Sequence, residues 1–239
     1  MTISDSERRV ISLLDYFKQA TTTQLRSIVF PDSKSRTTSD RVLKKLLRGN
    51  YVIHVERRRL VGGGRGGGGE YVWALGPAGW RICDRPGRFR REGAIDYHAL
   101  TITDLYSRLR TSEREGAIKL DGFTPEPECH LNVGGIYLKP DLLVEVSRAN
   151  GRRLTSWLEI DMSTQRPARL NEKMDRYQQA YKTISDESLQ QFNDGSFPLV
   201  VFVCHGDDRQ REITWLIERR DDDPRLFRAV TIDNFPLGL

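Results

Sequence analysis

The hydrophobic positions of the first fifty residues recur at helical spacing in three short segments. A first helix is predicted over residues 5–19. A second, short helix is predicted with Thr22 or Thr23 as its N-cap, and it ends before Pro31, because proline cannot continue a helix. A third, over residues 37–49, has one apolar face and one basic face. The basic face consists of Arg41, Lys44, Lys45 and Arg48.

Two β-type runs follow, at residues 51–61 and 70–75, and they enclose the segment GGGRGGGG at 62–69. Because glycine has the largest backbone freedom of any residue, we expect a flexible hairpin tip there. Three helices followed by a two-stranded hairpin, or wing, is the order of elements in a winged helix-turn-helix domain. The third helix of such a domain enters the DNA major groove. We therefore expect phosphate and guanine contacts with double-stranded DNA. The hairpin carries four further arginines, which would contact DNA together with the basic face of the third helix: Arg57, Arg58, Arg59 and Arg65.

A charged segment with Pro and Gly, residues 84–93, is expected to be a linker between a DNA-binding domain at 1–83 and a second domain at 94–239. The second domain has a mixed pattern of helices and strands, which predicts an α/β (α+β) fold with a mixed central sheet. In order, it predicts a helix at 94–111, strands at 118–128, 136–147 and 152–161, a helix at 166–186, a strand at 198–204, a helix at 207–220 and a strand at 226–232.

The charge of the chain is divided unequally between these two parts. Residues 1–92 carry 19 Lys and Arg against 9 Asp and Glu, and the remainder carries 19 against 24. A basic domain joined to a mildly acidic one favours a polyanion as the partner of the first. Apolar runs stay well below the ~20 residues that a membrane-crossing helix needs, and the chain starts without a secretory pattern. The three cysteines lack zinc or disulfide spacing. We expect a cytoplasmic protein that does not associate with membranes.

Three carboxylates fall on two neighbouring predicted strands. Asp141 interrupts the apolar strand at 136–147, where an isolated charge is costly unless it is paired or ligated. The turn at 149–151 folds the next strand back beside it, and Glu159 and Asp161, two residues apart, share a face of that strand. Like charges placed so close together suit a divalent cation, and oxygen ligands favour Mg²⁺ or Mn²⁺. No organic cofactor is expected.

The αβββαβ order, with KPD at 139–141 and LEID at 158–161, resembles the PD-(D/E)XK nuclease fold. The resemblance implies that Asp141 and Glu159 bind metal, but Asp161 stands where the family has its catalytic lysine. Lys173 on the predicted long helix is a candidate replacement, since the segment KMDRY at 173–177 lies where RecB-like members of the fold carry Q-x-x-x-Y. The alternative is that Lys173 is a surface lysine.

Other motifs extend along most of the chain: YVWALGPAG after the wing, HAL at 98–100, DLY at 104–106 and RPARLNEKMDRY at 166–177. With the predicted winged helix and the KPD and LEID motifs, they are similar to the replication-relaxation family of plasmid and mobile-element proteins, over residues 5–232. The resemblance implies DNA processing during replication, nicking or transfer. It also implies replication or transfer proteins of the same element as partners.

His98 lies on the apolar side of the helix predicted at 94–111. There it is either a general base near the metal or, more commonly for such a position, a core histidine bonded to a backbone carbonyl. A covalent relaxase mechanism would need a tyrosine nucleophile. No tyrosine is accompanied by a histidine cluster, and Tyr177 and Tyr181 fit the apolar stripe of the long helix.

Two functions from different classes fit these residues. The first is a Mg²⁺-dependent DNA endonuclease or nickase, in which Asp141, Glu159 and Asp161 hold the ion and Lys173 stabilises negative charge. The second is a non-catalytic, site-specific DNA-binding protein, either an initiator accessory or a repressor, whose nuclease domain has lost its chemistry. The aspartate at position 161 favours the second function.

Overall fold

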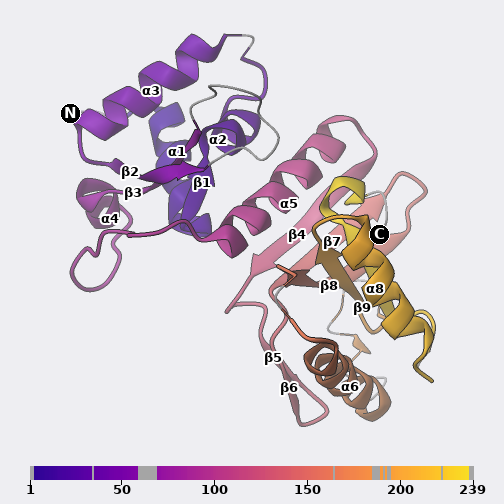
Figure 1. The fold of residues 1–239 in the computed structure, drawn as a ribbon. Coiled ribbons are helices and arrows are strands. Elements are labelled where there is room, and N and C mark those ends of the chain that lie inside the picture. The colour runs from indigo at the N-terminus through magenta and orange to yellow at the C-terminus, as the bar shows by residue number, and fades with distance from the viewer. Residues whose placement is uncertain are drawn as a thin grey trace. The chain divides into compact units, whose positions relative to one another are not determined.

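The computed structural model describes residues 3–33, 35–58, 69–163, 165–184, 189–190, 192, 195–221 and 223–236. The chain forms two compact units, Met1–Ser107 and Arg108–Leu239 (Figure 1). Within the described residues, helices that are both long enough and apolar enough to cross a membrane are absent.

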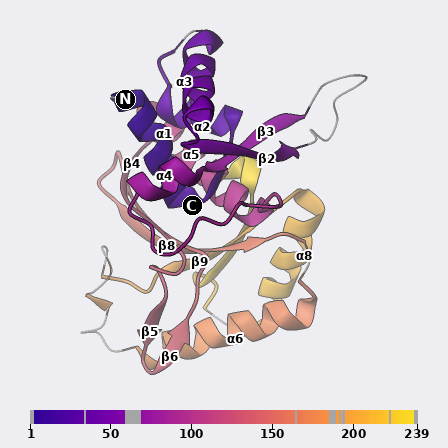
Figure 2. The same ribbon diagram turned by 90° about the vertical axis from the view of Figure 1, so that its left-hand side faces the viewer.

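The N-terminal unit combines helices with a small antiparallel sheet. Its helices are α1 (Asp5–Phe17), α2 (Thr22–Val29), α3 (Arg36–Arg48) and α4 (Pro77–Ile82). The sheet has the order β1-β3-β2, with β1 at Gln19–Thr21, β2 at Val52–Arg58 and β3 at Glu70–Leu75. Figure 2 shows β2 and β3 side by side, as their antiparallel register requires. The three predicted helices and the predicted hairpin are therefore present.

Strand β1 was not expected, because three residues are too few to show a hydrophobic period. It is fully buried and pairs with β3, so that Ala20 lies opposite Trp73. Its last residue, Thr21, also caps α2. The Thr21 hydroxyl accepts a hydrogen bond from the Gln24 amide, and the Gln24 side chain accepts one from the Thr21 amide at 2.7 Å.

The boundary between the two units lies at Ser107 and Arg108, inside α5 (Tyr97–Arg114), and not in the predicted linker at 84–93. The first half of α5 is bonded to the N-terminal unit. The Gln24 amide group donates to the Leu100 carbonyl at 2.9 Å and to Asp104 at 2.6 Å. Ser107 donates to Ser27 at 2.9 Å. These polar contacts join residues about eighty positions apart, which local composition does not reveal.

The C-terminal unit contains a five-stranded mixed sheet, as predicted, in the order β10-β9-β8-β7-β4. Strands β8, β9 and β10 are parallel, whereas β4 and β7 run antiparallel to their neighbours. A separate ribbon is formed by β5 and β6. The elements are β4 (Ile118–Pro125), β5 (Leu131–Val133), β6 (Ile136–Leu138), β7 (Leu142–Arg148), β8 (Arg153–Asp161), α6 (Pro167–Thr183), β9 (Leu199–Cys204), α8 (Asp207–Glu218), β10 (Phe227–Thr231) and the 3₁₀ turn Ile232–Asn234.

The strand predicted at 136–147 is two strands, because the chain leaves one ladder before it enters the next. Pro140, which has no backbone N–H to donate, lies between β6 and β7. Asp141 therefore immediately precedes β7 and does not lie within a strand. Its backbone N–H already bonds to the Leu158 carbonyl of β8, at 3.1 Å.

The core of this unit packs α6 and α8 against the sheet. Trp157 of β8 and Phe202 of β9 are almost completely buried there. The helices contribute a stripe each to the same cluster: Leu170, Met174, Tyr177 and Ala180 from α6, and Ile213 and Leu216 from α8. The stripe on α6 fixes which of its other side chains point toward β8, since residues three and four apart share a helix face.

Replacing Gln24 by alanine is expected to lower the free energy of unfolding by about 2 kcal/mol, because it removes a cap and the two hydrogen bonds to Leu100 and Asp104 of α5. Urea unfolding measures the loss. Gln179→Ala, at an exposed position of α6, is the matched control and should change stability by less than about 0.5 kcal/mol. Equal effects in the two variants would contradict the role given to Gln24.

Candidate active site

The antiparallel pairing of β7 with β8 places Asp141 beside Glu159. The last register pair is Leu142 with Leu158, so the next position before β7 faces the next position on β8. The Asp141 side chain is fixed there, since its Oδ2 accepts a hydrogen bond from the Ile160 backbone N–H at 2.6 Å. The side chain of Asp141 is half-buried.

Glu159 is the most strongly perturbed carboxylate of this cluster. Its side chain is 2 % exposed and lies on the face of β8 that packs against α6. Lys173 Nζ is 2.5 Å from Oε2, and the Tyr177 hydroxyl donates to Oε1 at 2.5 Å. Burial raises the pKa of Glu159 to about 7, and the charge of Asp141 adds to this, although Lys173 and Tyr177 oppose it. Glu159 therefore titrates near neutral pH.

Helix α6 brings Lys173 and Tyr177 to Glu159 because these two residues are one turn apart on the same helix face. Lys173 keeps 27 % of its side chain exposed, so its ammonium group reaches the carboxylate from the solvent side. Tyr177 is buried, and burial raises the pKa of its hydroxyl well above the ordinary value, with a further contribution from Glu159. Tyr177 is thus a neutral donor that orients Glu159 and is poorly suited to act as a nucleophile.

Asp161 is not brought into this cluster, although it is on the same face of β8 as Glu159. It is 1 % exposed and forms an ion pair with Arg209 of α8. The Ser163 amide donates to its second oxygen at 3.1 Å. Arg209 also donates to the Gln165 carbonyl and to Glu212, each at 2.7 Å. Asp161 is therefore the counter-ion of a mostly buried arginine, and the predicted group of three carboxylates is reduced to Asp141 and Glu159.

Glu126 is a third carboxylate besides Asp141 and Glu159, and the sequence pattern did not indicate it. Its backbone N–H donates to the Asp141 carbonyl at 3.0 Å, and carboxylate oxygens of the two residues lie within 4.8 Å of each other. The register of β4 with β7 explains this, since Pro125 pairs with Leu142 and the next residue falls beside Asp141. In the sequence, Glu126 has no motif around it, so only the strand pairing could have identified it.

Cys129 lies close to the same acids, but it is chemically inert. Its thiol donates to the Pro140 carbonyl at 3.0 Å. Burial raises the pKa of the Cys129 thiol to about 12, and the nearby charges of Asp141, Glu126 and Glu159 act in the same direction. Because the thiolate is the reactive species, this cysteine is not a nucleophile at neutral pH.

The donor set suits a hard divalent cation. Asp141 and Glu126 offer carboxylate oxygens within reach of one ion, and these are the ligand atoms that Mg²⁺ and Mn²⁺ prefer. Each carboxylate oxygen of Glu159 has two lone pairs, so its bonds to Lys173 and Tyr177 leave acceptor capacity for a metal. Asp141 and Glu126 therefore fit the cation that the sequence predicted, whereas the oxygens of Glu159 do not lie within 4.8 Å of both of those carboxylates.

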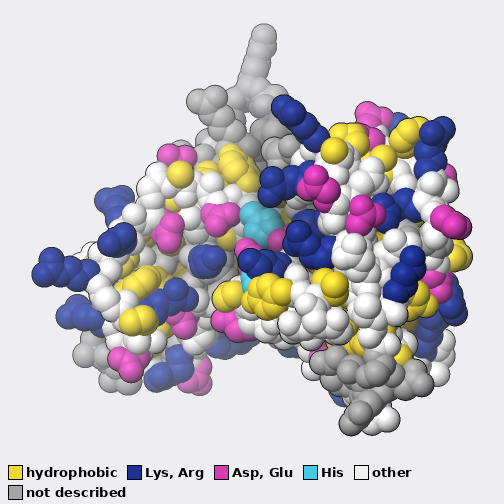
Figure 3. Space-filling model, turned by 90° about the horizontal axis from the view of Figure 1, so that it is seen from below, with side chains coloured by type: hydrophobic (Ala, Val, Ile, Leu, Met, Phe, Trp, Pro, Cys, Tyr) yellow, Lys and Arg dark blue, Asp and Glu magenta, His cyan; other side chains and the backbone are white. Residues whose placement is uncertain are grey.

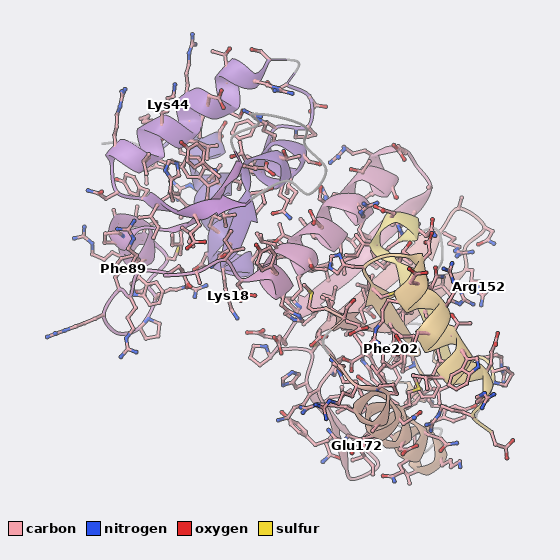
Figure 4. The ribbon with its side chains drawn as sticks, viewed as in Figure 1. Lys18, Lys44, Phe89, Arg152, Glu172 and Phe202 are labelled. Carbon is pink, nitrogen blue, oxygen red and sulfur yellow. The ribbon has the colours of Figure 1, made fainter. Side chains whose placement is uncertain are left out.

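The remaining predicted residues belong to the N-terminal unit. His98 lies in the first turn of α5 and is half-buried. On α3, the four predicted basic residues are exposed, and Figure 4 labels Lys44 among them. Lys45 is also held by Glu7 of α1, at 2.6 Å. Arg57 and Arg58 are in β2, whereas Arg59 and Arg65 lie outside the described residues.

These features define an α+β protein with a buried glutamate, a lysine and two further acids at the start of β7 and the end of β4. A family model described as replication-relaxation matches residues 11–200, so the chain belongs to the replication-relaxation family. Membership indicates a role in the replication or relaxation of a plasmid or mobile element. Comparisons with curated proteins and with solved structures give no match.

Removing Arg209 should be much more damaging than removing a neighbouring exposed arginine. Arg209→Ala leaves the buried Asp161 charge uncompensated, and we expect a loss of about 3–5 kcal/mol in the free energy of unfolding. The control is Arg211→Ala on the same helix, whose ion pair with Asp208 is exposed and is worth about 0–1 kcal/mol. Chemical denaturation measures both. A loss below about 1 kcal/mol in Arg209→Ala would show that Asp161 does not depend on this partner.

The raised pKa of Glu159 predicts a pH-dependent stability. Folding strengthens proton binding, because the pKa rises from the ordinary 4.5 to about 7. The resulting stabilisation is complete below pH 4.5 and is lost as the pH rises through 7. Without divalent cations, the wild-type protein should lose about 2 kcal/mol more than Glu159→Gln between pH 5 and pH 8. Denaturant titrations across this range test this, with Glu172→Gln as the exposed control on α6. Parallel profiles for wild type and Glu159→Gln would refute the shift.

Proposed function

We propose that the protein is a metal-dependent DNA nuclease or nickase that acts during replication or relaxation of its genetic element. The observation that carries this proposal is the arrangement around Glu159. A buried carboxylate that titrates near neutrality is in contact with a lysine and lies beside Asp141. Acids with perturbed pKa values, grouped with a partly exposed lysine, mark a candidate catalytic site.

The topology of the C-terminal unit supports a PD-(D/E)XK-like assignment. Helix α5, strands β4, β7 and β8, helix α6 and strand β9 follow each other in the αβββαβ order, with the β5–β6 ribbon inserted before β7. Asp141 precedes the second core strand, Glu159 lies near the end of the third, and Lys173 follows on the helix. These are the places that the resemblance gives to the metal-binding acids and to a lysine that has moved to the helix.

Asp141 and Glu126 would hold a Mg²⁺ or Mn²⁺ ion, with Glu159 as a further acid beside Asp141, and the ion would supply Lewis-acid stabilisation of a phosphodiester oxygen. Lys173 would place its ammonium group against the negative charge that develops on the phosphate. Tyr177 keeps the Glu159 carboxylate in one orientation through its hydrogen bond. Exposure of the lysine to solvent on one side gives a phosphate access to it.

The N-terminal unit supports DNA as the substrate. Three helices and a three-stranded sheet with a β2–β3 hairpin follow the order of a winged helix, and the exposed basic residues of α3 fall on the helix that this fold places in the major groove. Arg41, Lys44 and Arg48 would neutralise phosphates or donate to guanine edges.

A second candidate function is DNA binding without cleavage, and one observation favours it. At the position where the nuclease motif has its lysine, the chain has Asp161, and that residue is committed to Arg209. In this case the C-terminal unit would serve the assembly of replication proteins.

Supercoiled plasmid carrying the replication origin of the element, incubated with protein and Mg²⁺ or Mn²⁺, is expected to become relaxed. Glu159→Gln and Asp141→Asn should reduce the nicking rate by about 100-fold or more, because each removes a negative charge from the proposed metal site, and Lys173→Met by about 10- to 100-fold. The matched control is Glu172→Gln, an exposed acid on the same helix, which should keep the wild-type rate. Gel electrophoresis of the topoisomers gives the readout.

Each outcome selects one function. Nicking that persists in Glu159→Gln would remove the site assignment. Salt-sensitive binding of origin DNA, measured by fluorescence anisotropy, with an unchanged plasmid in every metal, would establish the non-catalytic alternative. Thermal unfolding of each variant separates a loss of chemistry from a loss of folding.

A further inference from the structure

A cavity of about 510 Å³ opens in the C-terminal unit near the beginning of β8. Its walls come from the turn between β7 and β8, the end of α6 and the segments that lead into β9 and β10. Arg152, which is labelled in Figure 4, is one of the residues that line the cavity. Five arginines contribute to the lining: Arg148, Arg152, Arg153, Arg225 and Arg228.

Arginine is the most frequent residue among the described residues that line this cavity, and Asp223 is the acidic residue among those described residues. The Asp223 carboxylate is already held by Arg225, with Nε and Nη2 at 3.0 and 2.8 Å, and by the Tyr181 hydroxyl at 3.0 Å. The concentration of arginine is unusual for this part of the chain, where acids outnumber bases 24 to 19 from residue 93 onward. On the face drawn in Figure 3, basic and acidic side chains are interspersed.

Thr155 gives independent evidence for a ligand. It lines the cavity from β8 and is 3 % exposed. Within the part of the chain that the structure describes, its buried Oγ1 makes no hydrogen bond. Leaving a buried hydroxyl unsatisfied costs about 1–3 kcal/mol. A ligand in the cavity that offers a hydrogen-bonding group would satisfy this hydroxyl.

The other walls are apolar and aromatic. The rings of Tyr181 and Phe197 meet edge to face, with centroids 5.2 Å apart and an angle of 70° between their planes. Leu154, Leu199 and Leu226 complete this side. An apolar, aromatic wall combined with several guanidinium groups matches a ligand that has both a planar ring and anionic oxygens, and the volume lies in the range of small-molecule sites, about 300–1,000 Å³.

We propose that this cavity binds a nucleotide, with its phosphate groups among the arginines and its base against Tyr181 and Phe197. Guanidinium groups bind phosphate oxygens through paired hydrogen bonds, and Thr155 would add one hydroxyl contact. The ligand is either a free nucleotide or the phosphorylated end of a DNA strand, since the two present the same chemistry.

This site is separate from the carboxylate cluster. Thr155 and Glu159 lie on the same face of β8, but Trp157 fills the position between them and is fully buried. Four residues of strand span about 13 Å. Nucleotide binding at this cavity can therefore be tested independently of the proposed nuclease activity.

The test is isothermal titration of the full-length protein in EDTA, so that metal binding at the carboxylates does not contribute. The probes are ATP, inorganic pyrophosphate, and a short oligonucleotide with a 5′-phosphate or a 5′-hydroxyl. We expect saturable binding of ATP, or of the 5′-phosphorylated oligonucleotide in preference to its 5′-hydroxyl form. ATP should bind more tightly than pyrophosphate, because only ATP has a base for the aromatic wall.

Two variants locate the binding. Arg152→Gln combined with Arg228→Gln should weaken it by tenfold or more, whereas Arg211→Gln, an exposed arginine of α8 outside the cavity, should leave it unchanged. Thr155→Val is the sharper variant, since it preserves shape and removes the unsatisfied hydroxyl. It should leave the ligand-free protein equally or more stable to denaturant and lower the affinity about tenfold.

Preferred binding of ATP identifies a free nucleotide as the ligand, and preferred binding of the 5′-phosphorylated strand identifies a DNA end. The proposal is overturned if none of the probes saturates, if the arginine variant binds as tightly as the wild type, or if pyrophosphate and ATP bind equally. A stability loss in Thr155→Val without ligand would also overturn it, since the hydroxyl would then have a partner within the fold.

Discussion

The contact between Glu159 and Lys173 is the constraint on which the C-terminal unit depends. A carboxylate that is 2 % exposed can be kept in a protein interior only if its charge is balanced or its proton retained. Both effects act on Glu159. Lys173 and Tyr177 stabilise its ionised form, whereas burial favours its protonated form. The result is an acid near the midpoint of its titration at neutral pH, held by a helix whose apolar stripe fixes its rotation against the sheet.

Most of the fold could be predicted from the sequence because most of its elements have a regular hydrophobic period. The helices at α1, α3, α5, α6 and α8, and the strands β8, β9 and β10, lie within a few residues of their predicted positions. Prediction was less successful where a single residue or a distant partner decides the structure. Pro140 divides one expected strand into two, and Gln24 attaches the first half of α5 to the N-terminal unit. Neither effect changes the local hydrophobic pattern.

The candidate site was predictable for the residues whose spacing places them and not for those that need tertiary pairing. Asp141 and Glu159 were identified, together with Asp161, from strand adjacency, and Lys173 from the resemblance of KMDRY to the RecB-like motif. The structure brings Asp141, Glu159 and Lys173 together. The different environment of Asp161 could not be foreseen, because its partner Arg209 is 48 residues further along the chain on another helix. Glu126 was missed for a similar reason, since only the register of β4 with β7 brings it to Asp141.

The pairing of Asp161 with Arg209 also constrains how this lineage can change. A lysine at position 161 would place a cation against the guanidinium group of Arg209, whose side chain is only 10 % exposed. That substitution would be disfavoured by repulsion between like charges, and loss of Arg209 alone would leave the buried Asp161 carboxylate without its counter-ion. Positions 161 and 209 are therefore energetically coupled, and a lysine at this place on β8 would require a second substitution on α8.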